Sequence, residues 1–358
     1  MRKSERGAQR GRVGGLLPLM ALLVLSAGCA SLPRHVEKVR SEALPNPDIT
    51  TLGRIIATEE RAHKHLSGIR LLSSGEEALA DLIALADHAE RTLDIQYYII
   101  HQDDSARTLL QHVRSAADRG VRVRVLVDDL NTAGEDRRFL HLGQHVNVEV
   151  RVFNPFPGGR STTWTRILAS VSDIPRINHR MHNKLFVADN ALAITGGRNI
   201  GDEYFTRDKR SNFIDLDVVA AGPIVPQLSA SFDAFWNSKY AYPIASLASP
   251  EEAERPAAAA AAPPATAAPL NDGSPGDPEW LKHELDAHTL KMNWVPAMVT
   301  FEPFSVAVAW PSPATVSCMA RSSGTGERRA LKLAEVCASA ASDNIPTARH
   351  ALICICII

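Results

Sequence analysis

The sequence predicts an α/β protein: an α/β/α sandwich with a mostly parallel mixed sheet over residues 67–245, followed by an irregular C-terminal tail. Three observations favour this class. Short runs rich in Val, Ile and Tyr alternate along the chain with longer amphipathic stretches. Helices of that length between strands favour crossover connections, which make neighbouring strands parallel. Capping residues and glycines stand where such helices would begin and end.

The elements can be predicted in order from Ser74. This serine can cap a helix whose apolar stripe continues to Leu85. A β-rich run follows, and then an amphipathic helix that ends at Gly120, because glycine readily adopts the left-handed conformation that follows a helix. The elements predicted in this part of the chain are strand 92–100, helix 106–119, strand 121–127, helix 135–142 and strand 146–153.

Two apolar runs, 185–188 and 191–195, are separated by a short polar step at Asp189 and the asparagine after it. This pattern indicates a β-hairpin. Asp189 can close the turn by accepting hydrogen bonds from nearby backbone amides, so we interpret it as a structural clamp. A further strand over 213–219 and a helix with apolar positions from 228 to 236 complete the predicted sandwich.

Residues that can bind an anion stand at both ends of this predicted hairpin. His182 and Lys184 stand two apart at the start of the first run, so in a strand their side chains would project from one face and converge on one ligand. The second run ends in Gly196 and Gly197, where missing side chains would let an anion approach the backbone. Asn199 offers an amide donor nearby. Together these groups suit a phosphate.

The order His-x-Lys-x4-Asp, then six residues and Gly-Gly-x-Asn, resembles the HKD signature of the phospholipase D superfamily. Residues 198–205 resemble its cardiolipin synthase-like branch, and the resemblance extends from about residue 69 to residue 238.

The resemblance implies that His182 attacks the phosphorus of a phosphodiester to give a phosphohistidine intermediate, while Lys184 holds phosphoryl oxygens. It also implies a phospholipid substrate such as phosphatidylglycerol, and catalysis without a metal or another cofactor. The residues that it assigns are His182, Lys184 and Asp189 for catalysis, and Gly196, Gly197 and Asn199 for binding the substrate phosphate.

Catalysis in this superfamily needs a second histidine as general acid and base, a contribution of about 10²–10⁴ in rate. Most members take it from a second HKD motif. Three histidines follow residue 206, namely His283, His288 and His350, and none has a lysine two positions later. We therefore interpret residues 279–358 as a truncated or aberrant start of a second half, with a frameshift past Met298 as a hypothesis. A homodimer that pairs two copies of His182, or a non-catalytic remnant, remains open.

The first residues predict a secretory signal with a lipobox, residues 1–29. Basic residues precede the apolar run 16–25, which is too short to span a bilayer, since about twenty apolar residues are required. Cys29 is the expected lipidation site, and ordinary signal-peptidase cleavage is the alternative. The expected location is a bacterial outer membrane, facing the periplasm. Residues 30–66 would form a tether and leading helix, and the Ala/Pro-rich residues 246–278 a linker.

The net charge of −1 and a hydrophobic content of 45% describe an ordinary globular protein without bulk attraction to nucleic acid. A nuclease working as a homodimer stays open, with residues 207–210 as its basic cluster. Asp128 and Asp129 could be metal ligands, but turn and cap roles are favoured because no third ligand stands at a useful spacing. Either Gln96 or Tyr98 could lie near the pocket, although strand packing is the simpler role, and the loop around residue 164 could form a lid.

Overall fold

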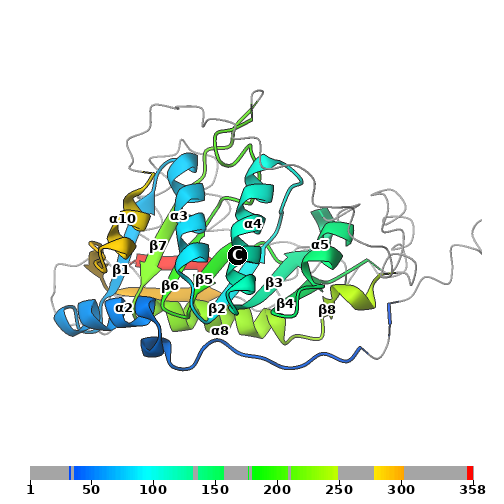
Figure 1. Cartoon of the computed structure of the whole chain (residues 1–358), viewed down its shortest axis with the longest axis horizontal. Helices are drawn as coiled ribbons and strands as arrows, with labels where there is room; N and C mark the ends of the chain where they lie inside the picture. The colour runs from blue at the N-terminus through cyan, green and yellow to red at the C-terminus, as the bar shows by residue number, and fades with distance from the viewer. Residues whose placement is uncertain are drawn as a thin grey trace, which may run out of the picture.

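The computed structural model describes residues 32–33, 36–131, 136–156, 176, 180–208, 211–248, 278–301 and 353–357. Within these residues, a nine-stranded sheet has the order β8-β4-β3-β2-β5-β6-β7-β1-β9 (Figure 1). Its strands are β1 Ser67–Leu72, β2 Thr92–Tyr97, β3 Arg122–Asp128, β4 Val148–Phe153, β5 Leu185–Ala188, β6 Leu192–Gly196, β7 Asp217–Ala221, β8 Ala241–Pro243 and β9 Asn293–Val295. A separate pair joins β10 Ala297–Phe301 and β11 Ile353–Ile357.

Helices pack against this sheet on both faces. The α-helices are α2 Thr51–Ala62, α3 Gly75–His88, α4 Asp104–Asp118, α5 Asp136–Leu142, α8 Ile224–Trp236 and α10 Trp280–Asp286. Short 3-10 turns are η1 Pro47–Ile49, η2 Asp129–Asn131 and η4 Ile244–Ser246. None of the helices in the described part of the chain is long and apolar enough to cross a bilayer.

The predicted α/β class with a mixed sheet is confirmed, but parallel pairing is less extensive than expected. Only the β2–β3 and β3–β4 pairs are parallel, and the other neighbours in this sheet are antiparallel. The cause is the length of the connections, because parallel neighbours need a crossover. Helices α4 and α5 supply these crossovers, whereas β5 and β6 are joined by a tight turn.

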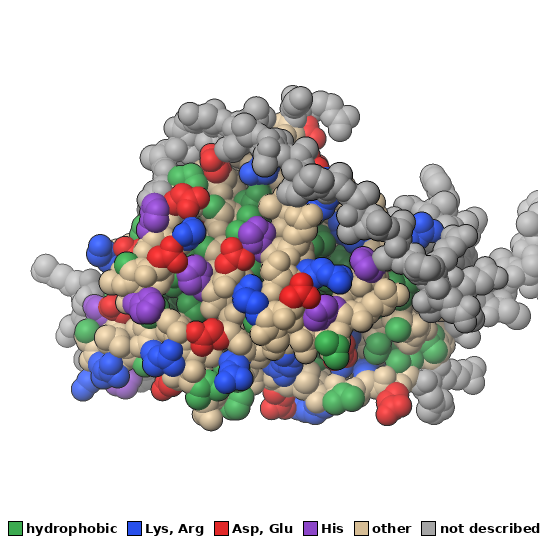
Figure 2. Space-filling model, viewed as in Figure 1, with side chains coloured by type: hydrophobic (Ala, Val, Ile, Leu, Met, Phe, Trp, Pro, Cys, Tyr) green, Lys and Arg blue, Asp and Glu red, His purple; other side chains and the backbone are tan. Residues whose placement is uncertain are grey.

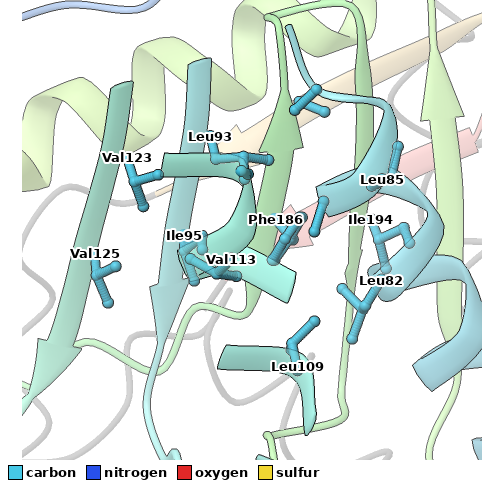
Figure 3. Close-up of a cluster of buried hydrophobic side chains, with 14 of the residues drawn as sticks. Leu82, Leu85, Leu93, Ile95, Leu109, Val113, Val123, Val125, Phe186 and Ile194 are labelled. Carbon is cyan, nitrogen blue, oxygen red and sulfur yellow. The ribbon is translucent and has the colours of Figure 1, made fainter. Parts of the chain in front are cut away.

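The main core lies between the sheet and helices α2, α3, α4 and α10. Figure 3 shows its centre, where leucines of α3 and α4 meet strand residues from β2, β3, β5 and β6. Phe186 of β5 is fully buried there. A second cluster lies on the other face, under α8. The hairpin that carries the predicted motif therefore runs through the middle of the sheet, with packed side chains on both faces.

The predicted helix ends are confirmed by their hydrogen bonds. The Ser74 hydroxyl accepts from the Glu77 backbone N–H at 3.0 Å, and Gly120 has a φ of +95° directly after α4. Asp103 caps the start of α4 by accepting from the Ala106 N–H at 3.1 Å. Local capping thus fixes where α3 starts and where α4 starts and stops.

Several predicted boundaries differ from the structure. Residues 213–216, predicted as the start of a strand, lie before β7 and belong to no helix or strand. Both α10 and β9 pack onto the first sheet, with β9 pairing with β1, and the predicted division of the chain at residue 279 stays a prediction. The predicted signal and Cys29, most of the linker 246–278, the loop around residue 164 and residues 302–352 lie outside the described residues.

A buried ion pair under α8 was not anticipated from the alternating arginines of β3. The Arg124 guanidinium donates two hydrogen bonds to the Asp94 carboxylate, at 2.6 and 2.7 Å, and contacts Asp233 of α8 at 2.9 Å. It also donates to the Ser41 carbonyl at 2.9 Å. The segment that precedes α2 is thereby fixed to the same face of the sheet as α8.

Candidate active site

His182 and Lys184 lie immediately before β5, at the edge where β2, β3 and β4 end. The Lys184 Nζ lies 3.0 Å from His182 Nδ1 and 3.0 Å from Nε2, and donates to the His182 carbonyl at 2.7 Å. The predicted convergence of the two side chains is therefore confirmed, although both residues precede the strand. The Thr195 hydroxyl donates to the Lys184 carbonyl at 2.8 Å, which ties this segment to β6.

Tyr98 forms a third side of the site. Its ring centroid lies 4.8 Å from that of His182, and the Lys184 Nζ lies 5.6 Å from the Tyr98 ring centroid. Gln96, the other candidate, lies within β2, is fully buried and pairs in register with Leu185 inside the sheet, whereas Tyr98 directly follows that strand. The residue that reaches the histidine is thus Tyr98. His182 remains exposed to solvent, whereas Lys184 is 4% exposed.

The pKa values follow from these surroundings. Desolvation of the ring against its neighbours, and then the Lys184 ammonium, lower the pKa of His182 to about 4. Burial lowers the pKa of Lys184 to about 8, and the Asp215 and Asp217 carboxylates oppose that shift. At neutral pH the imidazole is therefore neutral and can act as a nucleophile, while most of the lysine is cationic.

Asp189 is a clamp, but it holds a different segment from the one expected. Its carboxylate accepts from three consecutive backbone N–H groups at the start of β2, at 2.8–3.0 Å. Those donors belong to Glu90, Arg91 and Thr92. Asp189 and the next residue have φ values of +54° and +51°, as a tight hairpin turn requires. The sequence could not show this partner, because β2 is distant along the chain.

Gly196 and Gly197 are required for close packing against the chain that enters β7. A Cβ on Gly196 would lie 2.1 Å from Asp217 Oδ1, and one on Gly197 would lie 2.7 Å from Asp215 Oδ1. The missing side chains thus admit two carboxylates next to the site. This is a different physical reason from the anion approach expected from the sequence, and the phosphate-binding role of these glycines stays a prediction.

Asn199 holds the loop after β6 against the end of β2. Its Oδ1 accepts from the Ile99 backbone N–H at 3.1 Å, and its side chain is also hydrogen bonded to Tyr204. The side chain is 4% exposed. In this structure Asn199 therefore positions the loop, and its predicted contact with a substrate phosphate stays a prediction.

Asp215 and Asp217 are the site residues that sequence reasoning missed. Asp217 is buried, accepts from the Arg198 backbone N–H at 3.1 Å, and pairs with the Arg198 guanidinium at 3.3 Å. Burial raises the pKa of Asp217, and Arg198 opposes the shift. The sequence pattern that could have revealed them is Asp-x-Asp directly before an apolar run. In a strand, this spacing places two carboxylates on one face, here at the point where the chain enters β7.

Asp128 has the turn role that was favoured for it, because it accepts from the Leu130 backbone N–H at 2.8 Å, and both aspartates also accept hydrogen bonds from distant parts of the chain. Asp128 accepts from the Met181 backbone N–H at 2.9 Å and pairs with Arg180 at 3.0 Å, so it fixes the backbone just before His182. Asp129 accepts from the Phe156 N–H at 2.7 Å. Among the described residues, no group of three or more His, Cys, Asp or Glu side chains is arranged to hold a metal ion.

Comparisons with known proteins find relatives of part of the chain. Residues 82–236 match a family model described as the PLD-like domain of cardiolipin synthase. Cardiolipin synthase C of Escherichia coli (strain K12) is 42% identical over 192 residues, which cover 54% of this chain and 40% of that protein. An uncharacterized protein of Helicobacter pylori (strain J99) is 35% identical over 230 residues, covering 63% of this chain and 45% of the other. Among solved structures, NucT from Helicobacter pylori aligns with a TM-score of 0.34 and 14% identity, covering 49% of this chain and 98% of that one.

Residues 82–236 therefore form a domain of the phospholipase D superfamily. Within that superfamily the domain is cardiolipin synthase-like, as the matched family model and the matched cardiolipin synthases show. The chain spans less than half the length of these curated relatives, with 40%, 45% and 32% of three of them covered.

Proposed function

We propose that the chain catalyses phosphatidyl transfer through a covalent intermediate on His182. The observation that carries the proposal is an exposed, neutral imidazole with a lysine ammonium 3.0 Å from its ring nitrogens. An imidazole nitrogen attacks the phosphorus, and the bond from phosphorus to the leaving alcohol oxygen breaks. The Lys184 ammonium stabilises the charge that develops on the phosphoryl oxygens. The leaving alkoxide takes up a proton.

The second step releases the intermediate. The hydroxyl of an acceptor loses a proton and attacks phosphorus, the phosphorus–nitrogen bond breaks, and His182 returns to its neutral form. A lipid acceptor gives cardiolipin, and water gives phosphatidic acid. Both proton transfers need a group that acts first as an acid and then as a base, and we propose that His182 of a second copy is that group in a homodimer. The anionic phosphate held between the two imidazoles favours the protonated form of that second histidine in the first step. Without it, each unassisted step should slow by about 10²–10⁴.

The proposed substrate is a phospholipid such as phosphatidylglycerol. The matched cardiolipin synthases support it. On the face drawn in Figure 2, Lys and Arg side chains of the described residues are interspersed with Asp and Glu, and they do not form the basic patch that is typical of a nucleic-acid interface.

We further propose that Cys29 carries the lipid anchor, in a bacterial envelope and facing the periplasm. Mass spectrometry of the mature N-terminus tests this, and an unmodified terminus after Cys29 would contradict it.

Two assays distinguish the proposed transferase from a nuclease or an inactive protein. Purified protein is incubated separately with phosphatidylglycerol vesicles and with single-stranded DNA, and the products are analysed for cardiolipin, phosphatidic acid and cut DNA. We expect lipid products that His182→Ala abolishes. The matched control is His141→Ala, in the last turn of α5, which should leave turnover unchanged. Cut DNA without lipid products would favour the nuclease.

A further inference from the structure

A group of apolar side chains borders the candidate active site and is open to solvent. Ile214 is 99% exposed, Leu71 57%, Phe213 53% and Leu216 44%. We call these four residues the apolar rim. The other large apolar side chains that are exposed among the described residues belong to separate segments, at Val39, Ile49, Val146 and Met298.

The apolar rim is continuous with the site. Asp215 lies between Ile214 and Leu216, and its carboxylate packs against Gly197 and acts electrostatically on Lys184. Phe213 stacks on Tyr204, with ring centroids 5.0 Å apart, and Tyr204 is hydrogen bonded to Asn199. A molecule held at His182 would therefore extend onto these side chains.

Backbone contacts hold the rim in place. The Phe213 backbone N–H donates to the Glu203 carbonyl at 2.8 Å, and Leu71 pairs with Val218 in the β1–β7 ladder, one same-face step beyond Leu216. In Figure 1 the connection from β6 to β7 rises past the upper ends of α3 and α4. Exposed apolar side chains that are gathered in one place, as these four are, mark a surface that binds another apolar surface.

We propose that the apolar rim inserts into a lipid surface and brings the site to its substrate there. Its size favours lipid over a second copy of the chain. An exposed patch of this kind covers on the order of a few hundred Å², whereas a standard protein interface buries roughly 800 Å² per partner. Insertion into lipid needs only a few apolar side chains.

This inference rests on the proposed phospholipid substrate, and a local probe tests it in the full chain. Ile214→Trp protein is mixed with vesicles of phosphatidylglycerol and phosphatidylethanolamine whose acyl chains are brominated. The wild-type signal is subtracted. We expect bromine to quench the added tryptophan. The matched control is Val146→Trp, at a position 92% exposed before β4, at the other edge of the sheet, and it should not be quenched.

Two results of this measurement would overturn the proposal. One is equal quenching, or none, at positions 214 and 146. The other is a blue shift of the tryptophan at 214 that grows with protein concentration in the absence of vesicles, because a second copy would then cover the rim.

A kinetic comparison separates failure of the rim from failure of the proposed function. The double variant Ile214→Ser and Leu216→Ser should lose at least about tenfold in turnover of vesicular phosphatidylglycerol, because two apolar anchors are removed from the lipid. Its rate on the water-soluble diester bis(p-nitrophenyl) phosphate should match wild type. Equal losses on both substrates would contradict the proposal. If wild type turned over neither substrate, the proposed function would fail, while quenching at position 214 would still report the rim.

Discussion

At the level of single residues, the pKa values of His182 and Lys184 define the pH range in which both have the charge that catalysis requires. His182 is neutral above its pKa of about 4, and Lys184 is cationic below its pKa of about 8. We therefore expect kcat/KM for a soluble phosphodiester to rise through about pH 4, to level off, and to fall through about pH 8. A profile that rises only above pH 6.5 would show that the histidine has its ordinary pKa.

Replacing the lysine tests the cause of that shift. In Lys184→Met the ammonium is gone while burial stays, so the pKa of His182 should rise part of the way toward 6.5, as measured by NMR titration of the ring. Lys282→Met, on α10, is the matched control and should leave the titration unchanged. Because folding lowers this pKa, the native state loses stability as pH falls from 6.5 through about 4, and the variant should lose less.

The sequence predicted the pairing of His182 with Lys184 because spacing and residue type determine it. It offered Tyr98 only as one of two candidates beside the pocket, and it did not predict Asp217 beside Gly196, since both contacts depend on the strand order β2-β5-β6-β7. Long-range register cannot be derived from local patterns, because each strand pattern is compatible with many neighbours.

At the level of elements, the β5–β6 hairpin is held to the start of β2 by Asp189. Asp189→Ala leaves backbone donors without their acceptor, one of them the buried Thr92 N–H, so we expect a loss of about 2–4 kcal/mol in the free energy of unfolding. Asp189→Asn keeps one acceptor oxygen and tolerates the positive φ, so it should lose less. Urea denaturation measures both. Equal stability of Asp189→Ala and wild type would contradict the clamp.

The buried pair beneath α8 is a second test at this scale. The side chains of Arg124 and Asp94 are each 1% exposed. Asp94→Ala removes one of the two carboxylates that pair with the buried Arg124 guanidinium and leaves only Asp233, so it should lower the free energy of unfolding by about 3 kcal/mol. The exposed pair of Arg40 and Glu42 is the matched control, and Glu42→Ala should cost less than about 1 kcal/mol. Similar losses for the two variants in urea denaturation would argue against a special role of burial.

Elements with strong local signals were predicted well, as Ser74 before α3 and Gly120 after α4 illustrate. Short edge strands were missed, because β8 and β9 each have three residues and too little pattern to recognise. The predominance of antiparallel pairs was also missed. It depends on β7 lying between β6 and β1, an order that residue patterns do not specify.

At the level of the whole molecule, the question is whether one chain can complete the reaction. If turnover requires His182 from two copies, then coexpression of wild type with His182→Ala should lower activity with the square of the wild-type fraction, since only wild-type pairs have both histidines. A linear decrease would show that each chain works alone. Light scattering on the same preparations gives the oligomeric state.

The most direct test of the account is detection of the covalent intermediate. Protein is mixed briefly with phosphatidylglycerol, quenched under neutral or basic conditions because phosphorus–nitrogen bonds to histidine are labile in acid, and analysed by peptide mass spectrometry. We predict a phosphatidyl adduct on the peptide that contains His182, absent from His182→Ala. Lipid turnover with no adduct at His182, or turnover that persists in His182→Ala, would contradict the proposed mechanism.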